Sequence, residues 1–239
     1  MELFQSLIMM LSLVVISMSR LSLSPRQIEH KELNIGYLLI FCEGRTEENY
    51  LKYFSNIINR TKYNDIVIEI NTASGNAMTV LNYANDFLSK EDNHRKYANY
   101  EKYLVFDCDD PPNVQEVISN ALKSENEYNL LISNPLFEIW LLMHLEDVST
   151  PLSKKNIYKH MEYHLNLEDN TYIKQKDNNG IIRKIINNES LKSAIDNAKT
   201  LESIYISKNK SFKSNISELN PYTNVHALVE QFLIAISKV

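Results

Sequence analysis

Apolar runs and amphipathic stretches alternate through the first half of the chain. Four runs are short and bounded by turn residues, as expected of strands in a buried sheet; they are residues 35–41 (IGYLLIF), 65–71 (DIVIEIN), 102–106 (KYLVF) and 128–133 (YNLLIS). Apolar residues at helical spacing follow each of the first three runs, with Thr46 and Asn113 as candidate N-caps. This alternation predicts an α/β fold of the Rossmann-like kind, with a parallel sheet of about four strands and helices on both faces.

Beyond residue 148 the pattern becomes mainly helical. Helical spacing extends over residues 153–164, 190–206 and 224–237, and a polar loop over residues 166–180 separates the first two helices. Residues 89–99 form a second polar stretch, and Pro135 fits the first turn of a short helix. The domain organisation that follows is a leader (1–33), an α/β core (34–148) and a helical C-terminal part of the same domain (149–239).

The leader contains a strongly apolar segment, residues 3–18. It lacks the basic start and the small-residue cleavage site of a signal peptide, and it is short for a membrane span. Three interpretations stay open: a packing or partner-binding helix, a marginal membrane anchor, or a true start at Met18, which we favour. Nothing after residue 24 resembles a membrane span, so we expect a cytoplasmic protein without membrane attachment.

Charge and cysteine content narrow the class of protein. The net charge is −5, with 12 basic and 21 acidic residues before residue 151 and 13 basic and 9 acidic residues from there on. An acidic half that holds metal and a basic half that holds a polyanion is one interpretation, and ordinary surface variation is the other. The two cysteines, Cys42 and Cys108, each fall at the end of a buried strand. A disulfide framework or a zinc site is therefore not expected, and a reducing compartment is.

Acidic residues gather where two of the predicted strands end. Asp107, Asp109 and Asp110 follow the third strand, and Glu43 follows the first. The carboxyl ends of parallel strands share one edge of a sheet, so these acids can converge. Like charges in close proximity are costly unless a cation lies among them, and ligands that are all oxygen suit Mg²⁺ or Mn²⁺. The alternative is an acidic turn that only caps the next helix.

Three further residues lie on or near this edge. Ser133 ends the fourth predicted strand, and Glu138 and His144 follow it in an apolar helix. Glu138 is either a site residue or an exposed residue on the polar side of that helix. His144 is expected to be a packing residue rather than a ligand.

A glutamate after the first strand and an Asp-x-Asp after a later parallel strand are typical of Mg²⁺-dependent phosphoryl transfer. Four stretches extend this pattern: residues 41–50 (FCEGRTEENY), 105–110 (VFDCDD), 132–144 (ISNPLFEIWLLMH) and 220–223 (NPYT). With these stretches the chain resembles the Toprim fold and, within it, more closely the RloB-like family. The resemblance covers residue 34 to the C-terminus, and the block from Ser133 to Trp140 is its most specific part.

The resemblance implies roles for individual residues. Glu43 matches the catalytic glutamate, and Asp107 and Asp109 match the metal-binding pair. Ser133 and Glu138 match the Ser-Asn-Pro block and would complete a second metal site. Lys174 follows a tyrosine, as a lysine does in relatives, and would stabilise negative charge on the phosphate; Lys176 is an equal candidate for this role.

The resemblance also implies a biological role. RloB-like proteins look like nuclease components of bacterial anti-phage systems, encoded beside an ABC- or AAA-type ATPase, as in abortive-infection pairs of the AbiL kind. We therefore expect a metal-dependent endonuclease that acts on nucleic acid, on RNA rather than DNA, with tRNA first by analogy. The alternatives are a DNA nuclease and a non-catalytic, metal-binding subunit that docks onto the ATPase.

Overall fold

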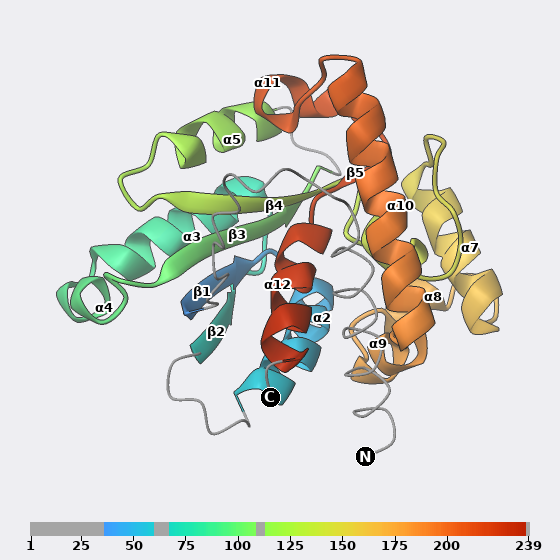
Figure 1. Ribbon diagram of the computed structural model, residues 1–239, viewed down its shortest axis with the longest axis horizontal. Helices are drawn as coiled ribbons and strands as arrows, with labels where there is room; N and C mark the ends of the chain where they lie inside the picture. The colour runs from blue at the N-terminus through green and yellow to red at the C-terminus, as the bar shows by residue number, and fades with distance from the viewer. Residues whose placement is uncertain (1–35, 60–66, 109–112, 238–239) are drawn as a thin grey trace, which may run out of the picture.

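The computed structural model describes residues 36–59, 67–108 and 113–237. Strands and helices alternate in its first half, and helices dominate the second (Figure 1). In chain order the elements are β1 (Tyr37–Cys42), α2 (Arg45–Ile58), β2 (Val67–Thr72), α3 (Ala77–Ser89), α4 (Glu91–Lys96), β3 (Glu101–Asp107), α5 (Val114–Leu122), β4 (Tyr128–Asn134), α6 (Glu138–Leu142), α7 (Lys154–Leu165), α8 (Tyr172–Gln175), α9 (Asn179–Ile185), α10 (Asn188–Ser207), α11 (Phe212–Asn215), the 3₁₀ turn η1 (Ile216–Glu218), β5 (Tyr222–Thr223) and α12 (His226–Ser237).

The strands form one sheet in the order β2-β1-β3-β4-β5. The first four strands are parallel, which confirms the predicted α/β class, and β5 adds a short antiparallel edge beside β4. After β1 the chain places β2 on one side of it and β3 on the other. The direction of winding therefore reverses between β1 and β3, and sheets of this kind bind ligands outside the carboxyl ends of the strands at such a reversal.

Both faces of the sheet are buried, because alternate strand residues enter two different cores. In β1, Leu38 and Ile40 belong to the core that includes residues of α2, α6, α10 and α12. Leu39 and Phe41 point to the opposite side, into the core formed with α3 and α5. Figure 1 shows α2 and α12 in front of the sheet and α3 behind it. Burial on both faces explains why these strands are continuous apolar runs rather than alternating ones.

Two predicted helix starts were wrong. Helix α2 has Gly44, not Thr46, as its N-cap, and the Thr46 hydroxyl instead donates a hydrogen bond to the Asp177 carboxylate at 3.2 Å. Pro135 follows a cis peptide bond, and α6 begins three residues later, at Glu138. The other predicted cap, Asn113, precedes α5 as expected, although its side chain makes no capping hydrogen bond. At Thr46 a tertiary hydrogen bond takes the place of the predicted cap, and at Pro135 a turn takes the place of the predicted first helical turn.

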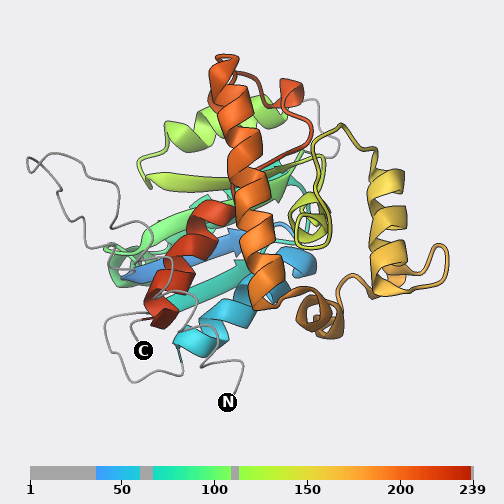
Figure 2. The same cartoon turned by 45° about the vertical axis from the view of Figure 1, so that its right-hand side comes forward.

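The predicted polar stretches contain short helices. Residues 89–99 include α4, and residues 166–180 include α8 and the start of α9, with Tyr172 fully buried. In Figure 2, helix α7 stands apart from the sheet at the right, and the long helix α10 crosses in front of the sheet. The helix predicted over 190–206 is confirmed as α10. The segment 166–180, predicted as a polar loop, therefore contains helical turns, and one of its residues, Tyr172, packs in the core.

No helix in the part of the chain that the structure describes is both long and apolar enough to cross a membrane. The apolar segment 3–18, and with it the rest of the leader, lies outside the described residues.

Candidate active site

Glu43 and Asp107 meet at the reversal point of the sheet. The Glu43 backbone N–H donates to the Val105 carbonyl at 2.9 Å, which extends the β1–β3 pairing by one residue. Its carboxylate oxygen Oε2 accepts a hydrogen bond from the Asp107 backbone N–H at 3.1 Å. Although 64 residues separate them, the two acids are thus neighbours at the carboxyl edge, as the sequence predicts.

Asp107 is also part of a row of aligned residues across three strands. It is opposite Ser133 in the β3–β4 register, and Ser133 is opposite Thr223 in the β4–β5 register. The Ser133 and Thr223 hydroxyls are 3.2 Å apart and share a hydrogen bond, and both residues are buried. The structure therefore brings Ser133 to the same edge as the acids, with its hydroxyl engaged by β5.

Glu138 is buried, with 1% of its surface exposed, so the interpretation of an exposed residue on the polar side is wrong. Its carboxylate forms an ion pair with Lys176, whose Nζ is 3.5 Å from Oε1. Burial raises the pKa of Glu138, and the positive charge of Lys176 only partly offsets this. Lys176 itself is desolvated, which lowers its pKa, but Glu138 and other nearby groups more than compensate and raise it overall.

The same contact separates the two candidate lysines. Lys176 contacts Glu138, whereas Lys174 is an exposed residue of α8. The sequence treats these lysines as equivalent because the spacing of a loop does not determine which side chain faces inward. Their roles in catalysis stay predictions, but the structure places only Lys176 against a buried acid of this edge.

Glu47 is a site residue that the sequence analysis missed. It occupies the first turn of α2, it is 5% exposed, and its pKa is raised by burial and by the Glu138 and Glu43 carboxylates, against a backbone hydrogen bond that lowers it. Its carboxylate packs against Gly44, where an added Cβ would lie 3.1 Å from Oε2. The available signal was helical spacing, since Glu47 lies on the same face of α2 as the apolar residues Tyr50, Leu51 and Phe54.

Two tyrosines flank the acids. Burial raises the pKa of Tyr158, and the Glu138 and Asp107 carboxylates act in the same direction, so this α7 residue lies within electrostatic reach of both acids. Tyr172 is fully buried, and its hydroxyl has no hydrogen-bond partner among the described residues. Charge from Glu138 and Glu47 adds to the effect of burial and raises the pKa of Tyr172. Helices α7 and α8 therefore form a tyrosine-lined wall beside the acidic residues.

His144, the two cysteines and the last two acids complete the set of predicted residues. Asp109 and Asp110 lie outside the described residues. His144 is a buried packing residue, as expected: its Nε2 is 3.1 Å from the Tyr50 hydroxyl and its Nδ1 is 2.9 Å from the Trp140 carbonyl oxygen. Within the described residues Cys42 is buried, Cys108 is half-buried, and neither cysteine forms a disulfide bond. Burial raises the pKa of the Cys42 thiol, which makes that thiol unreactive.

The chemistry of the acids fits an oxygen-ligated divalent cation. Glu47 and Glu138 are buried carboxyl groups with raised pKa values. Lys176 near both acids, and Lys154 near Glu138, offset the effect of burial only in part, so a cation would stabilise the charged forms. Within residues 36–59, 67–108 and 113–237, no three acidic, histidine or cysteine side chains are close enough to hold a metal ion by themselves. Mg²⁺ is commonly held by one or two carboxylates together with waters and substrate phosphates, and such a partial set meets that requirement.

A Rossmann-like sheet with a glutamate and an aspartate on adjacent strands at its reversal point defines an α/β protein with a candidate ligand site at the carboxyl edge. A comparison with protein families identifies it further. The family described as RloB-like protein matches residues 38–232, from β1 into α12, and the chain belongs to this family. None of the curated proteins and none of the solved structures compared with the chain matches it.

Proposed function

We propose that this chain is the nuclease component of a bacterial anti-phage abortive-infection system. In this proposal it is a Toprim-type, Mg²⁺- or Mn²⁺-dependent endonuclease that cuts RNA, with tRNA as the first candidate, and it works with an ABC- or AAA-type ATPase. Membership of the RloB-like family supports the biological role.

The observation that carries the catalytic part is the contact between Glu43 and the Asp107 backbone. Two acids 64 residues apart are joined at the one edge of the sheet where ligands of such folds bind. Because the backbone N–H of Asp107 holds the Glu43 carboxylate, the Glu43 side chain is fixed relative to strand β3, and a phosphodiester-cleaving site requires its acids to be positioned in this way.

Glu43, Asp107 and Glu138 are the described residues that would hold a divalent cation, together with Asp109 and Asp110. When bound, such an ion would stabilise the negative charge that develops on the scissile phosphate. Glu47, beside these acids, is a buried carboxyl group with a raised pKa, a property that suits transfer of a proton near neutral pH.

Lys176 would bind the substrate phosphate in the proposed reaction. Its ammonium group lies 3.5 Å from Glu138, at the edge of the group of acids that also includes Glu43, Glu47 and Asp107, and there it can contact a phosphate oxygen of the substrate. Half-buried cations act more strongly than exposed ones, because less water screens them. Tyr158 on α7 then forms a side wall that limits the access of water to the scissile bond.

The proposal is tested by growth arrest in a bacterial host that expresses the chain with its neighbouring ATPase. Glu43→Gln and Asp107→Asn remove one negative charge each at the reversal point and should abolish the arrest. Glu125→Gln is the matched control, because Glu125 is an exposed acid in the turn before β4, at the opposite edge of the sheet. Arrest that survives both site variants would favour the alternative of a non-catalytic subunit that docks onto the ATPase.

A further inference from the structure

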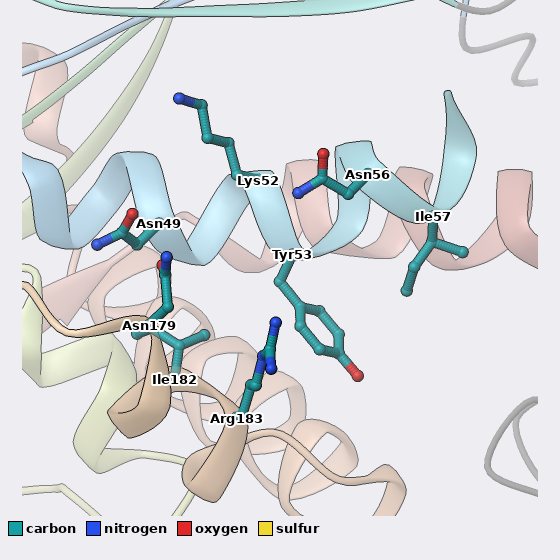
Figure 3. Close-up of a pocket in the computed structure, with 8 residues that line it drawn as sticks. All are labelled: Asn49, Lys52, Tyr53, Asn56, Ile57, Asn179, Ile182 and Arg183. Carbon is teal, nitrogen blue, oxygen red and sulfur yellow. The ribbon is translucent and has the colours of Figure 1, made fainter. Parts of the chain in front are cut away.

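A polar cavity of about 250 Å³ lies between α2 and α9 (Figure 3). Its lining combines an aromatic ring, two cations, three carboxamides and two isoleucines, and none of these described residues carries a carboxylate. The volume lies just below the roughly 300–1,000 Å³ of sites for drug-sized ligands, so it suits a single small unit rather than a large cofactor. The composition favours a ligand that has both negative charge and a flat, hydrogen-bonding ring.

Arg183 is the cation that is available to such a ligand. It is exposed and has no hydrogen-bond or ion-pair partner among the described residues, whereas Lys52 is paired with Glu48. Figure 3 shows the guanidinium group of Arg183 beside the ring of Tyr53. Burial raises the pKa of Tyr53 and the charge of Arg183 lowers it, which agrees with this proximity. A guanidinium next to a tyrosine ring is a common arrangement for contacting a phosphate and stacking on a base.

The carboxamides supply the remaining hydrogen bonds. Asn56 and Asn179, from the two walls of the cavity, make no side-chain hydrogen bond with another described residue. An asparagine side chain offers two donor hydrogens and one acceptor oxygen, a set that complements the edge of a nucleobase. Figure 3 shows Asn49 and Asn179 close to each other at one end of the cavity.

The two chain segments that form the walls of the cavity also carry residues of the candidate active site. Helix α2 carries Glu47 and, six residues further on, Tyr53; the opposite wall carries Lys176 and then Arg183. Asp177 joins the two walls, because its backbone carbonyl accepts a hydrogen bond from Asn49 at 2.8 Å. Six helical residues span about 9 Å, which equals between two and three stacked nucleotides at about 3.4 Å each.

From this geometry we infer that the cavity binds one nucleotide of a single-stranded nucleic acid, two or three positions from the scissile phosphate. Arg183 contacts its phosphate, Tyr53 stacks on its base, and the carboxamides hydrogen-bond the edge of the base. The inference rests on the proposed function for the identity of the substrate. A base within a duplex is stacked and paired, so the cavity selects unpaired segments such as loops.

Binding without cleavage tests the inference directly. Fluorescence anisotropy in EDTA measures the affinity of the full-length chain for a labelled 12-nucleotide single strand, as RNA and as DNA. Arg183→Gln should weaken binding about tenfold, and Tyr53→Ala should weaken it by about 5- to 150-fold, the range for loss of one stacking platform. Tyr53→Phe keeps the ring and should stay within about twofold of wild type.

Lys184→Gln is the matched control for Arg183→Gln. Lys184 is the next residue of α9, it is also exposed and it carries the same charge, but it does not line the cavity. Its substitution should change affinity by less than about twofold, whereas a purely electrostatic surface would lose as much from either change. Thermal melting of each variant shows whether it is folded, and Arg183→Lys, which keeps the charge, should recover part of the affinity.

The outcomes separate this inference from the proposed function. An equal effect of Arg183→Gln and Lys184→Gln, or none from either, overturns the inference even if wild type cleaves the same strand on addition of Mg²⁺. A selective loss with Arg183→Gln supports it, and the strand that shows the larger loss, RNA or DNA, identifies the natural ligand. If that selective loss is seen but wild type with its ATPase cleaves neither strand, the proposed function fails and the binding site stands.

Discussion

Acidification should destabilise this protein through His144. The imidazole is buried, and burial lowers its pKa to about 4, against a hydrogen bond to the Trp140 carbonyl that acts in the opposite direction. In the unfolded chain a histidine has a pKa of about 6.5. Between these two values the unfolded state binds more protons than the folded state, so the free energy of unfolding falls as the pH falls.

The size of the effect follows from the two pKa values. Their difference corresponds to about 3 kcal/mol when the pH has fallen below both values. Between pH 7.5 and pH 5 the expected loss from this residue is about 2 kcal/mol, and above pH 7 the contribution is close to zero. This loss is a large fraction of the roughly 5–15 kcal/mol that stabilises a typical domain.

Urea unfolding in EDTA measures this loss with a probe that the sequence provides. Trp140 is the single tryptophan, it is buried, and its ring centroid is 4.9 Å from that of His144, so its fluorescence reports the relevant core. His144→Gln should be less stable at pH 7.5, because the contacts to Tyr50 and Trp140 are altered, but it lacks the titrating group. The gap in stability between wild type and this variant should therefore narrow by about 2 kcal/mol between pH 7.5 and pH 5.

His94→Gln is the control for this experiment, since His94 is an exposed residue of α4. Its unfolding free energy should run parallel to that of wild type at every pH. If His144→Gln also runs parallel to wild type, the buried neutral state of His144 is refuted, and with it the packing role that we assign to this residue.

Three further predictions concern the site. Lys176→Met should lower the rate of RNA cleavage by about 10²- to 10³-fold, the usual cost of losing a group that stabilises developing charge, whereas Lys174→Met should leave the rate within about twofold. Gly44→Ala places a Cβ 3.1 Å from the Glu47 carboxylate and should lower the rate of cleavage. Gly36→Ala, with nothing within 4 Å of its Cβ, should leave the rate unchanged. Equal cleavage rates for the two variants would contradict the tight packing of Glu47 against Gly44. Mg²⁺ or Mn²⁺ at about 100 times its dissociation constant should stabilise wild type by about 2.7 kcal/mol in thermal melts, and Glu43→Gln should lose most of this gain.

Strong periodic signals made the sheet predictable. The buried strands β1, β3 and β4 are apolar runs with acids or turn residues directly after them. Because β1 and β3 are parallel neighbours, Glu43 and Asp107 at their carboxyl ends meet at one edge. Strand β5 has only two residues, so its sequence carries no periodicity, and only the tertiary pairing with β4 defines it. The N-cap at Thr46 was wrong because its hydroxyl bonds to Asp177, a contact made across 131 residues.

The inward-facing residues of irregular segments were harder to predict. Lys174 and Lys176 are two positions apart in a loop, and the short helix α8 decides which of them contacts Glu138. Glu47 resembles an ordinary acidic residue in the first turn of a helix, where negative charge is favourable, and this reading hides its burial against Gly44. In both cases long-range packing, which no local pattern encodes, determines the site.

Sequencing of RNA ends tests the central claim most directly. The measurement compares cells that express wild type with its ATPase and cells that express Asp107→Asn with the same ATPase. The account predicts new RNA ends at a small number of sites, tRNA loops first, in the wild-type cells and their complete absence with Asp107→Asn. New ends that persist in the Asp107→Asn cells, or a growth arrest in wild-type cells without any new RNA end, would contradict the assignment of this edge as an RNA-cleaving site.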